Sequence, residues 1–333
     1  LDMVEHLVGM QAQAPLAPYV GLWSRLAGLR TGELAGALTE RRAVRLTLMR
    51  GTVHLVSARD CLGLHPLVLP AVTRAVTGHH RSAMAAFDVD AVLAAGRDLL
   101  AGGPRTRAEL GAALSARWPG ADAEVMTYLV GALLPAVQVP PRGVWGAPAG
   151  RVEMAHAEDW LGRPADRDRR VDTLVRRYLA AFGPASVADV QRWSGLTRLR
   201  EVLDAMADLR RFRDGEGREL YDVPDAPLPD PDLPAPVRFL PEYDNVLLSH
   251  ADRSRVVPDG RPVPLPPGPG AAIGTVLVEG TYRADWRMGD AVLTVTPFGP
   301  LTSGERAELV AEGTRLAAFL RPGGPADVRL RVP

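Results

Sequence analysis

Apolar and polar positions along this chain follow a pattern that recurs about three times, each time as helices followed by a β ribbon. In the first repeat, residues 1–8, 19–29 and 32–40 have helical spacing, and residues 45–57 alternate as strands do. In the second repeat, a capping-box spacing at Thr106 and Glu109 begins a helix that runs to Trp118. A further helix at 123–134 and a ribbon at 137–145 follow.

The third repeat is the clearest. Residues 186–193 and 196–209 are predicted helices on either side of a turn at Gly195, and residues 212–221 are typical of a hairpin. One helix–turn–helix pattern is weak evidence, since glycine turns between helices are common. Three in tandem, each ending in a ribbon, favour winged-helix motifs.

The character of the chain changes after a proline- and aspartate-rich linker at residues 222–236. Short strands are predicted at residues 237–240, 245–249, 272–278, 282–287 and 291–295, with a turn at 258–261. A final amphipathic helix is predicted over residues 303–320, capped by Ser303. We therefore expect a small β-barrel-like region or a strongly curved sheet here.

The predicted fold class is α+β, with tandem winged-helix motifs followed by this C-terminal region. The expected domains are winged helices at residues 1–60, 61–160 and 161–225, and a linker with the β-rich domain at residues 226–333. Because the chain begins at Leu1 within a predicted helix, the first winged helix is expected to lack its natural start.

Composition narrows the possible functions. The formal net charge is zero, which argues against a protein that coats nucleic acid indiscriminately. Since the sequence contains no lysine, a Schiff base, a phosphate-loop lysine and a lysine general base are all excluded. The single cysteine, Cys61, excludes a disulfide framework and a cysteine metal cluster. No signal segment or membrane-length apolar run is found, so we expect a protein of the bacterial cytoplasm.

Gln11 and Gln13 are the first candidates for chemistry. They stand at alternate positions of an otherwise apolar stretch, and each amide has donors and acceptors that must be satisfied if it is buried. One interpretation is a polar helix end stopped by Pro15, with both side chains in solvent. The other is a pair of amides that hold a water molecule or a substrate in a cleft.

A second group of polar residues lies on the predicted strand near residue 50. Period-two spacing places Arg50, Thr52 and His54 on one strand face, directed toward the same cleft as the glutamines. The alternative for His54 is a hydrogen-bonded core histidine. These three residues are candidates for DNA binding.

Other arginines are candidates for phosphate contacts, because a guanidinium suits bidentate oxygens. Arg253 and Arg255 follow the polar segment 240–245, although a solvated surface loop is the alternative interpretation. Two further groups have members on solvated helix faces: Arg167, Arg169, Arg170, Arg176 and Arg177, and Arg192, Arg198, Arg200, Arg210, Arg211 and Arg213. Hydrolase, phosphate-loop and zinc motifs are missing from the sequence, so neither a metal nor a cofactor is expected.

Several segments together resemble one bacterial family of tandem winged-helix proteins. These are residues 8–15 with the two glutamines, residues 21–26, residues 50–56, residues 240–244 with 252–255, and residues 278–280 with Trp286. Within that family the chain is similar to the AlkZ-type DNA glycosylases, whose signature of two glutamines around an apolar residue matches Gln11-Ala12-Gln13. The resemblance covers nearly the whole chain.

The resemblance implies a DNA glycosylase that unhooks alkylated bases and interstrand crosslinks and protects the producer of a DNA-alkylating natural product. Without lysine such an enzyme should be monofunctional, with Gln11 and Gln13 orienting the attacking water. The implied partner is double-stranded DNA carrying N7-alkylated purines, with no membrane, and the protein is expected to be a monomer.

Two rival functions remain at this point. A winged-helix transcription regulator would read bases from the helix at 196–209, which offers Arg198, Arg200 and Glu201 but also much apolar surface. A scaffold that binds a partner protein is the third interpretation.

Overall fold

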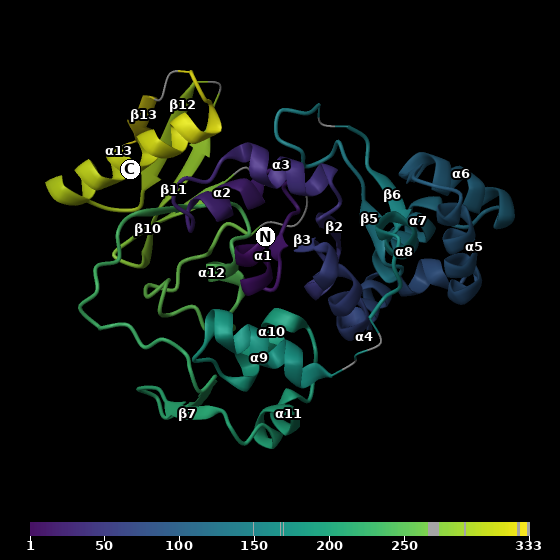
Figure 1. Cartoon of the computed structure of the whole chain (residues 1–333), viewed down its shortest axis with the longest axis horizontal. Coiled ribbons are helices and arrows are strands. Elements are labelled where there is room, and N and C mark those ends of the chain that lie inside the picture. The colour runs from purple at the N-terminus through teal and green to yellow at the C-terminus, as the bar shows by residue number, and fades with distance from the viewer. Residues whose placement is uncertain are drawn as a thin grey trace. The chain divides into compact units, whose positions relative to one another are not determined.

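The computed structural model describes residues 1–148, 150–166, 168, 170–265, 273–289, 291–324 and 327–331. Its residues form two compact units (Figure 1). The larger unit contains Leu1–Pro15 and Arg30–Ala226, and the smaller unit contains Leu16–Leu29 and Pro227–Pro333. Among the described residues, no helix is both long enough and apolar enough to cross a membrane.

The larger unit is built around a six-stranded sheet with the order β1-β3-β2-β5-β6-β4. Its strands are Met10–Gln11 (β1), Ala43–Thr47 (β2), Val53–Ser57 (β3), Arg105–Thr106 (β4), Ala136–Gln138 (β5) and Glu153–His156 (β6). Every pair of neighbouring strands is antiparallel. Val44, Leu46 and Val137 project from one face into the main apolar core.

Apart from the sheet, the larger unit contains helices and one hairpin (Figure 1). The helices are Asp2–His6 (α1), Thr31–Thr39 (α3), Ala58–Met84 (α4), Val89–Ala101 (α5), Arg107–Arg117 (α6), Ala123–Leu133 (α7), Ala157–Leu161 (α8), Val171–Phe182 (α9), Val187–Ser194 (α10) and Leu199–Ala205 (α11). The hairpin consists of Arg210–Arg213 (β7) and Glu219–Asp222 (β8).

The second and third of the predicted helix–turn–helix motifs with ribbons are confirmed in outline. Thr106 and Glu109 form the expected capping box at α6, and Gly195 ends α10 in the left-handed conformation. The predicted helix at 196–209 is too long: α11 begins only after Arg198, whose own φ is 60°, and ends at Ala205. The division of residues 1–225 into three separate winged-helix domains stays a prediction.

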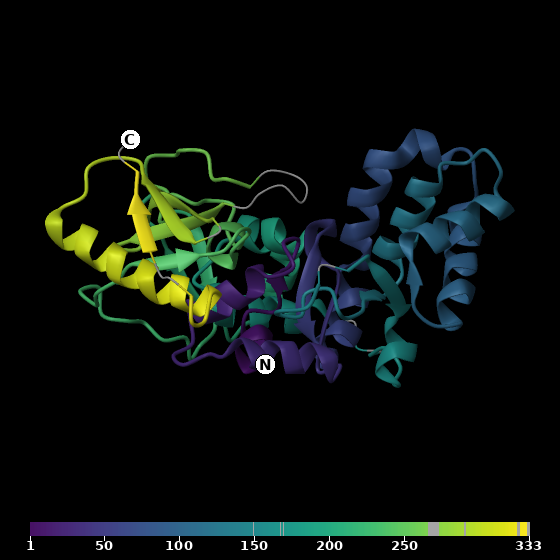
Figure 2. The ribbon, with the colours of Figure 1, turned by 90° about the horizontal axis from the view of Figure 1, so that it is seen from above.

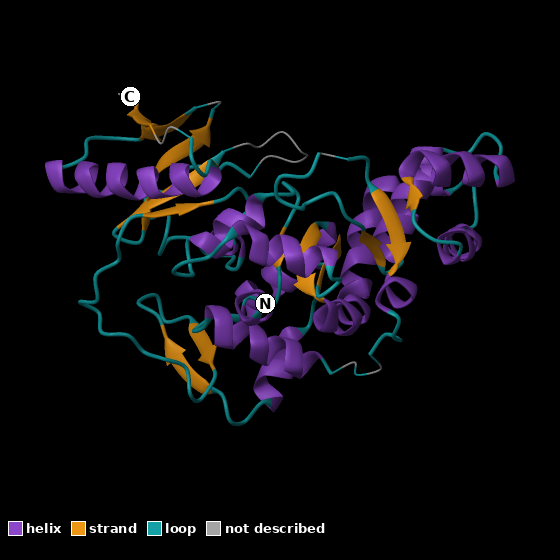
Figure 3. Ribbon diagram, turned by 45° about the horizontal axis from the view of Figure 1, so that its top comes forward, coloured by secondary structure: helices purple, strands orange, loops and turns teal. Residues whose placement is uncertain are grey.

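The smaller unit contains a five-stranded sheet with the order β13-β12-β11-β10-β9. Its elements are Ala17–Trp23 (α2), Arg238–Leu240 (β9), Asn245–Leu248 (α12), Gly274–Val278 (β10), Thr281–Met288 (β11), Val292–Pro297 (β12), Ser303–Leu320 (α13) and Asp327–Leu330 (β13). Figures 2 and 3 show α13 along one face of this sheet, where Leu309 and Leu316 pack with Phe239 and Val295.

Residues 16–29 differ from the predicted arrangement, which placed them in the first winged helix. In the structure they belong with the C-terminal residues, because Val20 is part of the apolar core around Phe239 and Trp286. Trp23 also packs on Phe319, with ring centroids 6.0 Å apart.

Three local predictions in the smaller unit need correction or restriction. The segment predicted as a strand at 245–249 is the short helix α12, because the Asp244 side chain accepts a hydrogen bond from the backbone N–H of Val246 and starts a helical turn. The cap of α13 is Thr302, which forms a capping box with Glu305, and not Ser303. The strand predicted at 272–278 is observed from Gly274, and residue 272 lies outside the described residues.

Candidate functional site

Gln11 and Gln13 lie on a short extended segment at the edge of the six-stranded sheet. Strand β1 pairs with β3, with Gln11 opposite His54, and the N–H of Ala12 donates to the carbonyl of Val53 at 2.7 Å. Glycine is required at position 9, directly before β1. Its φ is +91°, and a Cβ there would lie 2.7 Å from Cγ1 of Val56. The interpretation of this segment as a helix end is therefore wrong.

Each glutamine is held by its carbonyl oxygen. The Arg50 Nη2 donates to Gln11 Oε1 at 3.1 Å, and the backbone N–H of Val53 donates to Gln13 Oε1 at 3.2 Å. Gln11 is buried, with 7% of its surface exposed, and Gln13 is half-buried. A carbonyl oxygen has two lone pairs, so each amide can still accept from a water molecule and donate through its NH2 group.

Arg50 connects the glutamine segment to a helix end. It lies in a 3-10 turn, Met49–Gly51, between β2 and β3, with φ 58° at Arg50 and φ 70° at Gly51. Its Nη1 donates to the carbonyl of Trp193 at 2.6 Å, in the last turn of α10. A cation is favourable there because the last carbonyls of a helix have no partner within the helix.

His54 is a neutral acceptor beside Arg50. Its Nδ1 lies 2.8 Å from the carbonyl of Thr52, which requires the proton on Nδ1 and leaves the lone pair of Nε2 facing Arg50 Nη2 at 3.5 Å. Burial, together with the positive charge of Arg50, lowers the pKa of His54 to about 3. The ring is 2% exposed, so it carries no charge near neutral pH.

The predicted strand face of Arg50, Thr52 and His54 is only partly observed. Arg50 and His54 do meet beside Gln11, but through the turn and not through strand alternation. Thr52 is used within the turn, where its hydroxyl donates to the carbonyl of Met49 at 3.1 Å. DNA contact by these three residues stays a prediction.

Arg253 and Arg255 belong to the smaller unit. The Nε of Arg253 donates to the carbonyl of Leu247 at 2.7 Å, at the end of α12, and Arg255 is exposed. In the preceding segment, burial raises the pKa of the Glu242 carboxyl. Phosphate contact by the two arginines stays a prediction.

Many arginines near the third repeat form ion pairs with carboxylates, most of them on the surface and the one between Arg177 and Asp60 largely buried. The pairs include Arg170 with Asp168, Arg176 with Asp208, Arg177 with Asp60, Arg200 with Glu219, and Arg211 with Glu219 and Asp204. Arg167 and Arg169 lie outside the described residues. Base reading from α11 would have to compete with the pair between Arg200 and Glu219.

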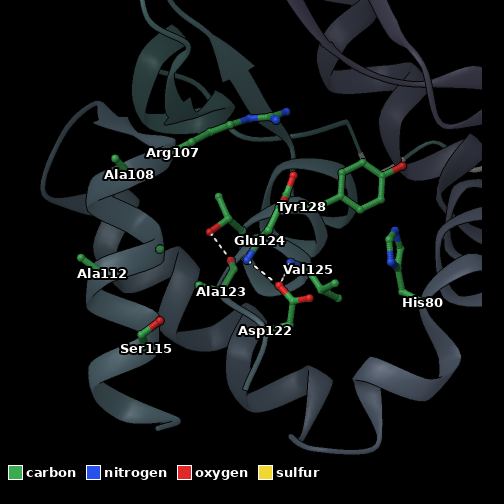
Figure 4. Close-up of a pocket in the computed structure, with 12 residues that line it drawn as sticks. His80, Arg107, Ala108, Ala112, Ser115, Asp122, Ala123, Glu124, Val125 and Tyr128 are labelled. Atoms are coloured by element: carbon green, nitrogen blue, oxygen red, sulfur yellow. Dashed lines mark hydrogen bonds between the residues drawn. The ribbon is translucent and has the colours of Figure 1, made fainter. Parts of the chain in front are cut away.

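A cavity of about 810 Å³ lies between α6, α7 and the end of α4 (Figure 4), and neither glutamine is among its lining residues. His80 and Tyr128 meet edge to face, with ring centroids 5.2 Å apart. Asp122 accepts from the N–H groups of Glu124 and Val125, so this carboxylate caps α7. Sequence reasoning did not find this cavity, and one of its polar lining residues, Asp122, serves to cap α7.

Sequence reasoning also missed Arg45, whose Nη2 donates to the carbonyl of Ala12 at 2.8 Å. The signal was an arginine between Val44 and Leu46 in a strand that is otherwise apolar. Among the described residues, no group of three or more His, Cys, Asp or Glu side chains is placed to hold a metal ion.

Comparison with known proteins gives three findings. The sequence model of the family described as "DNA glycosylase AlkZ-like" matches residues 4–319. The chain is similar to the interstrand DNA cross-link repair glycosylase of Streptomyces sahachiroi, 28% identical over 184 residues, which are 52% of this chain and 48% of that protein. This match thus spans about half the length of that relative. The solved structure of the Streptomyces sahachiroi DNA glycosylase AlkZ has a similar fold, with a TM-score of 0.78 at 22% identity over 99% of this chain and 93% of that one.

Proposed function

Because the chain belongs to the AlkZ-like DNA glycosylase family, we propose that it is a monofunctional DNA glycosylase. Its substrate is double-stranded DNA with N7-alkylated purines, and it hydrolyses their N-glycosidic bond. The similarity to an interstrand DNA cross-link repair glycosylase extends the proposal to interstrand crosslinks. The enzyme works as a monomer in the bacterial cytoplasm and protects the cell against a DNA-alkylating natural product.

The observation that carries the proposal is the fixed pair of glutamine amides. Gln11 Oε1 is held by Arg50 and Gln13 Oε1 by the Val53 N–H, so both amides are oriented before a substrate arrives. Such preorganisation is what the placement of a water molecule at C1′ requires. The second lone pair of each oxygen accepts from that water, and the positive charge of Arg50 favours hydroxide character on it.

The same geometry restricts the substrate. Glutamine is no general base near neutral pH, and the upstream carboxylate of Glu5 is paired with Arg59 at 2.6 Å. The Arg50 charge also disfavours a cationic sugar nearby. Bond cleavage must then be driven by the leaving group, and an N7-alkylated purine already carries the positive charge that makes it labile. Neutral lesions such as uracil are expected to be poor substrates.

The test is release of free base from duplex DNA that contains N7-methylguanine or a crosslink between N7 positions. Chromatography with mass detection should find the free base, and the DNA strand should stay intact until heat or alkali cleaves the abasic site. Gln11→Ala and Gln13→Ala should each abolish most of the release. Strand cleavage by the protein itself would contradict the monofunctional mechanism.

Gln191→Ala is the matched control, because Gln191 Oε1 also accepts a backbone N–H, from Leu199 at 3.2 Å, but serves α11. It should retain base release. If both glutamine variants of the site keep full activity, the site is wrong although the activity is right. If the wild-type protein releases no base and protects one DNA sequence in footprinting, the regulator interpretation replaces the glycosylase.

A further inference from the structure

Arg45 is a buried arginine that holds the peptide between the two glutamines. Only 1% of its surface is exposed, and its Nη2 donates to the carbonyl of Ala12 at 2.8 Å. Ala12 is itself fully buried, and its N–H donates to Val53 at 2.7 Å. Both sides of this residue are therefore hydrogen-bonded, one to β3 and one to Arg45 in β2.

The sheet register places Arg45 on the opposite face from the Gln11 side chain. Residues directly opposite each other in antiparallel strands project to the same face. Leu46 and Gln11 both lie opposite His54, whereas Arg45 lies opposite Leu55. The guanidinium of Arg45 therefore fixes the backbone of the segment from one face, while Arg50 fixes the Gln11 side chain from the other.

The surroundings of Arg45 are shaped to accept it. Gly143, with φ +86°, approaches the arginine so closely that a Cβ there would lie 3.0 Å from Cδ of Arg45. A buried charge is unfavourable compared with an apolar side chain of similar size, as at the neighbouring Val44 and Leu46. An arginine at this position is thus better explained by what it holds than by packing.

We propose that Arg45 is a positioning residue that sets the geometry of Gln11 and Gln13 through the Ala12 peptide. This role rests on the proposed glycosylase function for its effect on catalysis. Since Arg45 is buried, it acts on the rate of the chemical step and not on DNA affinity. Displacement of a reacting group by about 1 Å can lower a rate by about a hundredfold.

The test compares Arg45→Met, which keeps the length of the side chain but has no donor, with Arg45→Lys, which keeps a donor. Two quantities are measured for each: the single-turnover rate of N7-methylguanine release at saturating DNA, and the hydrogen exchange of the peptide that contains Ala12. Met154→Ala is the control, because Met154 is buried in β6 of the same sheet but packs in a different core around Leu110 and Val130.

Arg45→Met should lower the rate by about ten- to a hundredfold, accelerate exchange at Ala12 and leave DNA affinity unchanged. For Arg45→Lys, the rate and the exchange at Ala12 should lie between those of Arg45→Met and the wild type. If Arg45→Met does not fold, the same two measurements on Arg45→Lys test the proposal. An unchanged rate, or an unchanged exchange at Ala12, overturns the proposal. If the wild-type protein releases no base, the glycosylase function fails, and exchange at Ala12 alone then decides whether Arg45 holds the segment.

Discussion

Arg25 and Asp244, 219 residues apart in the chain, form a two-point ion pair within the smaller unit. The Nη1 and Nη2 groups of Arg25 donate to the two carboxylate oxygens of Asp244 at 2.9 and 2.7 Å. Only 1% of the Asp244 side chain is exposed, and Arg25 also donates to the carbonyl of Gly21 near the end of α2. The pair thus joins the segment after α2 to the start of α12.

Loss of this ion pair should destabilise the protein strongly. Asp244→Asn leaves the largely buried charge of Arg25, whose side chain is 16% exposed, without its counterion, and breaking a buried pair costs about 3–5 kcal/mol. Unfolding in urea should show this loss, and a double-mutant cycle with Arg25→Met should show strong coupling. Arg30→Met is the control, because its pair with Glu33 is exposed and should contribute little. Equal effects of Asp244→Asn and Arg30→Met would contradict the role of burial.

Substitution of Arg50 should lower base release while leaving the fold intact. Arg50→Met removes the donor to Gln11, so the amide loses its orientation and the rate should fall by about ten- to a hundredfold. Arg74→Met provides the comparison, because Arg74 also bonds the end of α10, at the carbonyl of Gly195, while its Nη1 donates to the carbonyl of Pro70 within α4. A similar fall in both variants would mean that the helix end, and not Gln11, is what matters.

The free energy of unfolding should decrease at acidic pH because His54 is held neutral in the folded protein. Its pKa is about 3 in the folded protein but about 6.5 in an unfolded chain, so between these values the unfolded state binds the extra proton. The contribution is complete above pH 6.5 and is lost as the pH falls toward 3. Urea midpoints measured from pH 7 to pH 4 should fall less steeply for His54→Phe than for the wild type. His79→Phe, at an exposed histidine, is the reference and should behave like the wild type. If the urea midpoints of His54→Phe fall with pH as steeply as those of the wild type, the prediction is wrong.

Substitutions at two neighbouring residues, Thr302 and Ser303, distinguish which of them caps α13. Thr302 accepts from the N–H of Glu305, and the Glu305 carboxylate accepts from the N–H of Thr302. Thr302→Ala should therefore lower the free energy of unfolding by about 1 kcal/mol. Ser303→Ala, one residue inside the helix, should have almost no effect. Thermal unfolding of the two variants under the same conditions measures this loss of stability. A larger loss for Ser303→Ala than for Thr302→Ala would show that Ser303 is the cap.

Local signals in the sequence predicted local structure well. The capping box at Thr106, the turn at Gly195 and the extent of α13 follow from side chains that act within one helical turn. The prediction failed where a competing local interaction was overlooked. The segment after Asp244 has an apolar, strand-like pattern, but it forms α12 because the Asp244 side chain caps a helical turn. Helix α4 was not predicted, because Pro66 and Pro70 lie inside it.

The candidate site was only partly predictable for a different reason. The sequence identified Gln11 and Gln13 as a pair of amides at positions i and i+2, and proximity of Arg50 to them was expected, but it did not show that the segment is extended. The contact between Arg45 and Ala12 depends on how β1, β2 and β3 are ordered in the sheet, which no short pattern encodes. The bond from Arg50 to Trp193 joins residues 143 positions apart and depends on tertiary packing alone.

That bond has a mechanical consequence. One guanidinium holds Trp193 at the end of α10 and Gln11 at the site, so a shift of the helix pulls on the amide unless a 2.6 Å hydrogen bond breaks. The Trp193 ring is in turn wedged against Tyr178 and Phe182 of α9. Force applied to these helices, for example by a bound duplex, would therefore be transmitted to Gln11, the side chain that we propose orients the water.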